Sequence, residues 1–109
     1  MILKDFTEFK SLLGTTLKPS AWLEVEQEMI DHFAAATKDY QWIHVDQQRA
    51  EKESPYKATI AHDFMSIALI PKFLTEVLDV SSLKMAYNYG LEEVRFPYPV
   101  VEGSFLRGI

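Results

Sequence analysis

The sequence contains no cysteine, which excludes disulfide bonds and thiolate metal sites and fits a reducing compartment. Its 11 basic residues are scattered singly in a chain of net charge −5, so no basic patch is available for a phosphate backbone. The longest apolar run, "FMSIALIPKFL", is too short to span a bilayer and contains Lys72. We therefore expect a soluble, cytoplasmic protein with no nucleic-acid partner and no membrane partner.

The composition is typical of a packed domain. The chain has 109 residues, of which 48% are hydrophobic and 13% aromatic, and it has only 4 glycines. A chain of this length buries roughly two thirds of its unfolded surface, which is enough for a single core. The N-terminus, "MILKDFTEFK", contains the acidic residues Asp5 and Glu8 and lacks a long apolar stretch, so it does not resemble a secretory or transit peptide. We expect one domain over residues 1–109.

The spacing of apolar residues predicts three helices. Residues 4–13 form a short amphipathic pattern that ends at Gly14, where a left-handed cap is expected. Residues 27–37 present a clear apolar face. Residues 59–78 are apolar nearly all round, which predicts a helix covered on most sides, and Pro71 predicts a kink or a lost hydrogen bond inside it.

Strand patterns are fewer. Three segments are expected to be strands or extended: 21–27, 83–96 with a bend at Gly90, and 103–109. The segment "QWIHVD" is also expected to be extended, and it leads into a loop over 46–58 with a helical turn at 46–52. One buried helix needs a larger sheet than these strands supply, so we expect a second chain to contribute.

The stretch "KDYQWIHVD" places His44 inside an aromatic and aliphatic run that has an aspartate on each side. The apolar neighbours predict burial, and a buried imidazole needs a hydrogen-bond partner. Asp39 or Asp46 could supply that partner and orient the ring for acid–base chemistry. A core histidine bonded to a backbone carbonyl is an equally weighted alternative. By contrast, His32 lies on the polar helix face and is expected to be solvated.

His62 and Asp63 fall in the first turn of the predicted helix over 59–78. Unpaired backbone N–H groups there could hold a substrate oxygen, whereas the alternative is a plain helix start with Thr59 as the N-cap. A metal site from His44, His62 and the nearby aspartates is a further alternative, but no H-E-x-x-H spacing is present. We expect no metal and no cofactor. Nucleophile elbows, P-loops and dinucleotide motifs are also absent, which leaves acid–base chemistry.

Three motifs, "DYQWIHVD", "TIAHDF" and "NYGLEEVRFPYPV", stand in an order and spacing that resemble the MaoC-like dehydratase family. This family includes the (R)-specific enoyl-CoA hydratases, and the likeness spans the chain from Trp22 to Arg107. The resemblance implies an α+β hot-dog fold, in which an antiparallel sheet wraps around a long central helix, here 59–78. It also implies a homodimer or higher homo-oligomer.

The resemblance further implies an activity and its residues. The family's Asp-x-x-x-x-His motif falls on Asp39 and His44, which would form the acid–base pair of a hydratase or dehydratase. The substrates would be 2-enoyl and 3-hydroxyacyl thioesters of CoA or acyl carrier protein. We expect substrate binding by His62, by the backbone N–H of Asp63 and by Trp42.

Two departures from the family pattern keep other functions open. The family usually reads His-Gly where this chain reads His62-Asp63, and family members continue past Ile109 with further strands. We therefore expect a sheet that is incomplete within one chain, with strand swapping between protomers as one way to complete it. The alternatives are a non-catalytic binding or interaction module and, because Asp63 offers a carboxylate, an acyl thioesterase.

Overall fold

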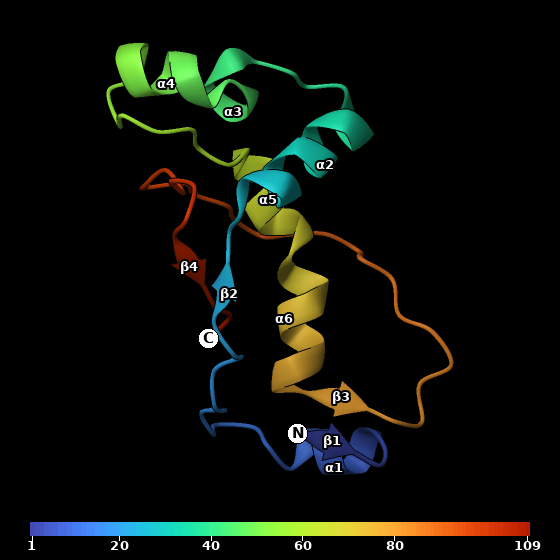
Figure 1. Cartoon of the computed structure of the whole chain (residues 1–109). Coiled ribbons are helices and arrows are strands. Elements are labelled where there is room, and N and C mark those ends of the chain that lie inside the picture. Colours follow the sequence, from blue (N-terminus) through green and yellow to red (C-terminus); the bar gives the residue numbers. More distant parts are fainter. The chain divides into compact units, whose positions relative to one another are not determined.

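The computed structural model describes all residues from 1 to 109, and Figure 1 shows the course of the chain. Contacts between residues divide it into two compact units. The first unit contains residues 1–21, 70–95 and 107–109, and the second contains residues 22–69 and 96–106. No helix combines the length and the apolar composition needed to cross a membrane.

The second unit contains most of the regular structure. Its elements are β2 (Leu23–Glu24), α2 (Gln27–Thr37), α3 (Trp42–Val45), α4 (Gln47–Glu53), α5 (Asp63–Ala68) and β4 (Phe105–Leu106). Strands β2 and β4 are antiparallel, with Leu23 opposite Leu106. A single antiparallel bridge joins Ile60 to Val101, so the 60–62 segment is attached to the chain just before β4.

The core of the second unit forms around α2. Val25, Ile30, Ala61 and Met65 are buried together, and the partly buried side chains that pack on them are Met29, Phe33, Leu69, Val100 and Leu106. The predicted helix over 27–37 is confirmed over its whole length, and the residues of its predicted apolar face are those turned to the core. Amphipathic spacing produces this result because residues three and four apart share one helix face.

In the first unit, a strand near the N-terminus pairs with a strand from the 70–95 segment. Its elements are β1 (Ile2–Leu3), α1 (Phe6–Lys10), α6 (Ile70–Val77) and β3 (Asp79–Val80). Strands β1 and β3 are parallel, with Ile2 opposite Asp79. The side chain of Asp5 caps α1 by accepting a hydrogen bond from the backbone N–H of Glu8. This helix is shorter than the predicted 4–13, and its C-cap is Ser11, not Gly14, although Gly14 has the expected left-handed backbone with φ of 79°.

The central helix predicted over 59–78 starts later in the structure than expected. The helix begins at Asp63, not at Thr59, and His62 is its N-cap residue. Thr59 does not cap it, since its hydroxyl donates a hydrogen bond to the side-chain oxygen of Gln27. The expected interruption is present, because α5 ends at Ala68 and α6 begins at Ile70. Pro71 has no N–H to donate to the Ile67 carbonyl.

The prediction that "QWIHVD" is extended was wrong, because residues 42–45 form α3 and the N–H of Asp46 donates to the carbonyl of Trp42. The helical turn predicted at 46–52 is confirmed as α4 over residues 47–53, so the expected loop over 46–58 is limited to its ends. Asp46 explains this helix, since its carboxylate accepts a hydrogen bond from the N–H of Arg49 and caps the first turn.

The predicted strand over 83–96 was also wrong. No strand is assigned between β3 and β4, and most of the side chains in this segment are exposed. A β pattern becomes a strand only when a neighbour accepts and donates its backbone hydrogen bonds, and this segment has no such neighbour. The strands expected within 21–27 and 103–109 are confirmed as β2 and β4, although each has only two residues.

Candidate active site

A cavity of about 530 Å³ lies in the second unit. Half of its lining residues are apolar: Phe33, Ile43, Ile60, Ala61, Phe64 and Phe96. The polar ones are Thr37, Asp39, Gln41, His44, His62 and Asp63. A volume of this size, with mainly apolar walls and a few converging polar groups, is typical of a small-molecule site.

His44 enters this cavity from α3 and is only 6% exposed. Its Nδ1 lies 2.7 Å from the carbonyl oxygen of Ile60. A carbonyl only accepts hydrogen bonds, so Nδ1 carries the proton, and Nε2 of the neutral ring is left with a lone pair. The backbone N–H of Ile60 donates in return to the carbonyl of Ile43, which holds the 60–62 segment beside α3.

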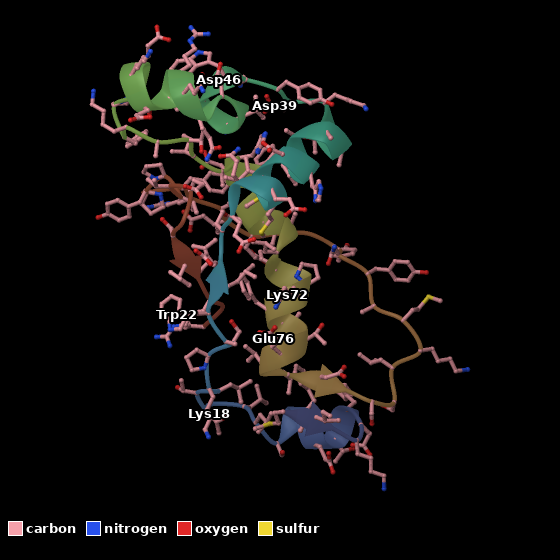
Figure 2. The ribbon with its side chains drawn as sticks, viewed as in Figure 1. Lys18, Trp22, Asp39, Asp46, Lys72 and Glu76 are labelled. Carbon is pink, nitrogen blue, oxygen red and sulfur yellow. The ribbon has the colours of Figure 1, made fainter.

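This hydrogen bond identifies the partner of His44, which the sequence left open. The partner of Nδ1 is a backbone carbonyl, and neither aspartate occupies that position. Asp46 is used to cap α4, as described above. Figure 2 labels both aspartates, Asp39 on the connection from α2 to α3 and Asp46 at the start of α4. The carbonyl bond does not exclude an acid–base role, because it leaves Nε2 free to accept a proton.

Asp39 is positioned by the end of α2. Lys38 adopts a left-handed backbone conformation with φ of 64°, and the N–H of Asp39 then donates to the carbonyl of Ala34. The Asp39 carboxylate accepts a hydrogen bond from the N–H of Gln41 at 3.3 Å. Its side chain is 41% exposed, so the carboxylate lies at the edge of the cavity with access to water.

His62 contacts both Asp39 and His44. Its Nε2 is 3.0 Å from the backbone carbonyl oxygen of Asp39 and 3.9 Å from a carboxylate oxygen of the same residue. Its ring stacks on the ring of His44, with 3.8 Å between centroids and 23° between planes. Phe33 covers it at a centroid distance of 5.0 Å. His62 is 4% exposed, and its Nδ1 is buried without a hydrogen-bond partner.

Asp39, His44 and His62 each bring one ligand-type atom within 4.8 Å of the others. The lone pairs of imidazole nitrogens lie in the ring planes, and stacked, nearly parallel rings direct them side by side instead of toward one point. This geometry does not match the convergence that a shared ion requires. It suits proton transfer by individual groups better than metal binding.

The other predicted residues are placed differently. Asp63 is the first residue of α5, is exposed and lines the cavity; its backbone N–H belongs to the helix start, where N–H groups lack intrahelical acceptors. Trp42 is not part of the lining, and the guanidinium carbon of Arg49 lies 4.3 Å from its ring centroid. His32 is exposed near Glu28, outside the cavity, as expected.

The contact of His62 with Asp39 was not predicted. The two residues are 23 positions apart, and no periodicity or spacing relates them. The available signal was the placement of His62 at the predicted start of an apolar helix, which indicated proximity to a binding site but not to Asp39.

Comparison with known proteins shows to which family the chain is similar. The family model described as "MaoC like domain" matches residues 8–109. The 3-hydroxyacyl-thioester dehydratase Z of Mycobacterium tuberculosis (strain ATCC 25618 / H37Rv) is 47% identical over 104 residues, covering 95% of this chain and 68% of that protein. Nodulation protein N of Rhizobium leguminosarum bv. viciae is 43% identical over 105 residues, covering 95% of this chain and 65% of that protein.

Among solved structures, the R-hydratase PhaJ1 from Pseudomonas aeruginosa in the unliganded form is similar with a TM-score of 0.65 and 24% identity. The similarity covers 84% of this chain and 57% of that chain, so this chain spans little more than half of the hydratase. The likeness establishes an α+β hot-dog fold. The family match over 8–109 and the 47% identical relative show that this chain belongs to the MaoC-like domain family.

Proposed function

We propose that this chain catalyses the reversible hydration of 2-enoyl thioesters to 3-hydroxyacyl thioesters, with Asp39 and His44 as the acid–base pair. The observation that carries the proposal is the hydrogen bond from His44 Nδ1 to the Ile60 carbonyl, which leaves Nε2 as a base beside Asp39 in one cavity. The names of two similar proteins, a 3-hydroxyacyl-thioester dehydratase and an R-hydratase, support this reaction class.

The reaction needs one water molecule and a base that becomes an acid. In the hydration direction, His44 Nε2 accepts a proton from the water while the water oxygen bonds to C3 of the enoyl group. The carboxylate of Asp39 orients the water, and the pair returns one proton to C2 on the same face. The proton taken equals the proton delivered, so the pair ends the cycle unchanged. Dehydration follows the same steps in reverse.

The cavity supports such a substrate. The walls supplied by Phe33, Ile43 and Phe96 are apolar, which suits an acyl chain. The backbone N–H of Asp63 is our proposed donor to the thioester carbonyl, supported by its place at the cavity and at a helix start. His62 and Trp42 remain predicted substrate-binding residues, and Trp42 has the weaker support because it lies outside the lining.

Hydrolysis of an acyl thioester is the second candidate function. Asp63 favours it, because this residue adds an exposed carboxylate to the cavity at the first turn of α5. The two reactions differ in their products. Hydrolysis releases a free thiol, which a thiol reagent detects, whereas hydration removes the enoyl-thioester absorbance and releases no thiol.

The test is hydration of crotonyl-CoA, followed as loss of the enoyl-thioester absorbance, by the chain as given and by His44→Ala. We expect activity in the unsubstituted chain and a loss of about 10²-fold or more in the variant. His32→Ala, at an exposed histidine outside the cavity, is the matched control and should retain activity. A folded chain without activity would contradict the proposal and favour a non-catalytic binding module.

We also infer that the functional protein is a homodimer or a higher homo-oligomer in the cytoplasm. Large apolar side chains of the predicted central helix are exposed, with Phe64 at 70% and Leu74 at 57%. Exposed apolar side chains of this size are commonly covered by another protein surface. The absence of cysteine supports a reducing compartment. CoA and acyl carrier protein are the two thioester carriers that we propose.

A further inference from the structure

We propose that His62 is a positioning residue for the acid–base pair, acting by a hydrogen bond to the backbone of Asp39 and by ring stacking on His44. The inference rests on the function proposed above and assigns no contact between His62 and the reacting atoms. Both contacts belong to the second unit, so they involve no arrangement between the two units.

The first contact fixes the peptide that carries the carboxylate. The Nε2 of His62 lies 3.0 Å from the carbonyl oxygen of Asp39, and because a carbonyl accepts, Nε2 must carry the proton. Asp39 follows a left-handed residue, Lys38, in a turn that leaves the carboxylate 41% exposed. The N–H of Asp39 is held by the carbonyl of Ala34, and its carboxylate accepts a hydrogen bond from the N–H of Gln41. The bond from His62 adds the one contact that holds the Asp39 carbonyl, and so fixes the peptide between Asp39 and Tyr40.

The second contact fixes the imidazole that serves as base. The rings of His44 and His62 are stacked at 3.8 Å between centroids, which blocks rotation of the His44 ring on that side. The other constraint on His44 is the bond of its Nδ1 to Ile60. A stacked ring on one face and a hydrogen bond at one edge together hold Nε2 of His44 in one position.

The unpartnered Nδ1 of His62 indicates that a histidine occupies this position because its Nε2–H donates to Asp39. When Nε2 donates to Asp39, the neutral ring must leave Nδ1 as an acceptor, and this atom is buried with no donor. Burying a polar atom without a partner is unfavourable, and an apolar ring would fill the same space without that cost. Packing alone therefore does not account for histidine at this position, whereas a required donor to Asp39 does.

Two substitutions separate the two contacts. His62→Phe keeps a ring that can stack on His44 and removes the donor to Asp39. His62→Gln removes the ring and keeps an amide N–H at about the place of Nε2. His32→Phe, at an exposed histidine on α2, is the matched control for the introduction of phenylalanine. Circular dichroism of each variant establishes that it is folded.

The readouts are the kinetics of crotonyl-CoA hydration and the carbon-13 shift of the Asp39 carbonyl. In His62→Phe we expect kcat to fall about 10²-fold with KM changed by less than about 3-fold, as for a displaced catalytic group. The Asp39 carbonyl signal should shift in the same variant. In His62→Gln we expect the signal and at least about a tenth of the kcat to be retained, since the donor is restored.

Three outcomes of these experiments decide whether the proposal holds. A folded His62→Phe variant with unchanged kcat and an unchanged Asp39 carbonyl signal would overturn the proposal. A His62→Gln variant that is no more active than His62→Phe would overturn the assignment to the Nε2–H donor. If the unsubstituted chain is inactive but the Asp39 signal responds to His62→Phe, the proposed function fails and the positioning contact stands.

Discussion

At His44, one hydrogen bond determines which ring nitrogen can act as a base. Sequence reasoning treated an aspartate partner and a backbone carbonyl partner as competing interpretations. The structure gives Nδ1 a carbonyl partner, Ile60, and that partner is what leaves Nε2 available. A hydrogen bond to a backbone carbonyl is therefore compatible with a catalytic role for His44. Asp39 lines the same cavity and is not the partner of Nδ1.

The role of Asp39 can be tested with Asp39→Asn. We expect kcat for crotonyl-CoA hydration to fall about 10²- to 10⁴-fold, because an uncharged amide orients the attacking water less strongly than a carboxylate does. Steady-state kinetics measure this effect. Asp46→Asn is the matched control, since Asp46 caps α4 and asparagine is an equally good N-cap. Equal activity in Asp39→Asn and the unsubstituted chain would remove Asp39 from the proposed pair.

At the level of single elements, α2 shows how a helix places a cavity-lining residue just after its end. Its apolar face is buried in the core, and the left-handed Lys38 then turns the chain so that Asp39 reaches the cavity. A left-handed conformation is unfavourable for lysine and neutral for glycine. Lys38 is therefore held in an unfavourable backbone conformation at the end of α2, directly before Asp39.

Substitution of Lys38 tests this conformational cost. Lys38→Gly should raise the free energy of unfolding by about 0.5–1 kcal/mol, because glycine adopts the left-handed position after a helix without strain. Denaturant titration measures the change. Lys52→Gly is the control, since Lys52 lies within α4, where glycine should lower stability by about 1 kcal/mol. A destabilised Lys38→Gly variant would show that the lysine side chain makes a larger contribution than the backbone strain.

The packing of α2 can be tested at Ile30, its largest fully buried residue. Ile30 is fully buried in the core of the second unit, so Ile30→Ala should lower the free energy of unfolding by about 2–5 kcal/mol through lost burial and a residual cavity. Thermal or denaturant unfolding measures this loss. Leu13→Ala, at an exposed leucine, should change stability much less. Similar effects for the two variants would contradict the assigned core.

At the scale of the whole molecule, the predicted central helix and its surroundings differ from the expected picture. The apolar segment over 59–78 is divided into α5 and α6, and several of its large side chains are exposed. Each strand pair has only two residues per strand, which gives little cover and little stability in isolation. These observations favour association with further copies of the chain.

Association can be tested by light scattering coupled to size-exclusion chromatography. We expect a mass of at least twice the 12.6 kDa of one chain. Leu74→Asp places a charge among exposed apolar side chains and should shift the protein toward the monomer mass. Thr75→Asp, at the next and more polar position, should have a smaller effect. A monomer mass for the unsubstituted chain at micromolar concentration would contradict the proposed oligomer.

Much of this organisation follows from local patterns in the sequence. The helix over 27–37 was predicted with its bounds and its buried face, because amphipathic spacing depends only on residues within one or two turns. The left-handed backbone at Gly14 and the interruption near Pro71 were predicted for the same reason, since each arises from the chemistry of one residue. The predicted cap at Gly14 was wrong, because α1 ends at Lys10 and its C-cap is Ser11. Asp39, His44, His62 and Asp63 were candidates from motif order, and all four line one cavity.

Other features depend on contacts between distant residues, and local patterns do not encode them. The partner of His44 Nδ1 is 16 positions away and the partner of His62 Nε2 is 23 positions away, so only the folded chain brings them together. The helical state of residues 42–45 and the absence of a strand over 83–96 have a related cause. A short apolar or alternating segment adopts the backbone that its tertiary neighbours can satisfy, because each buried N–H and C=O requires a hydrogen-bond partner.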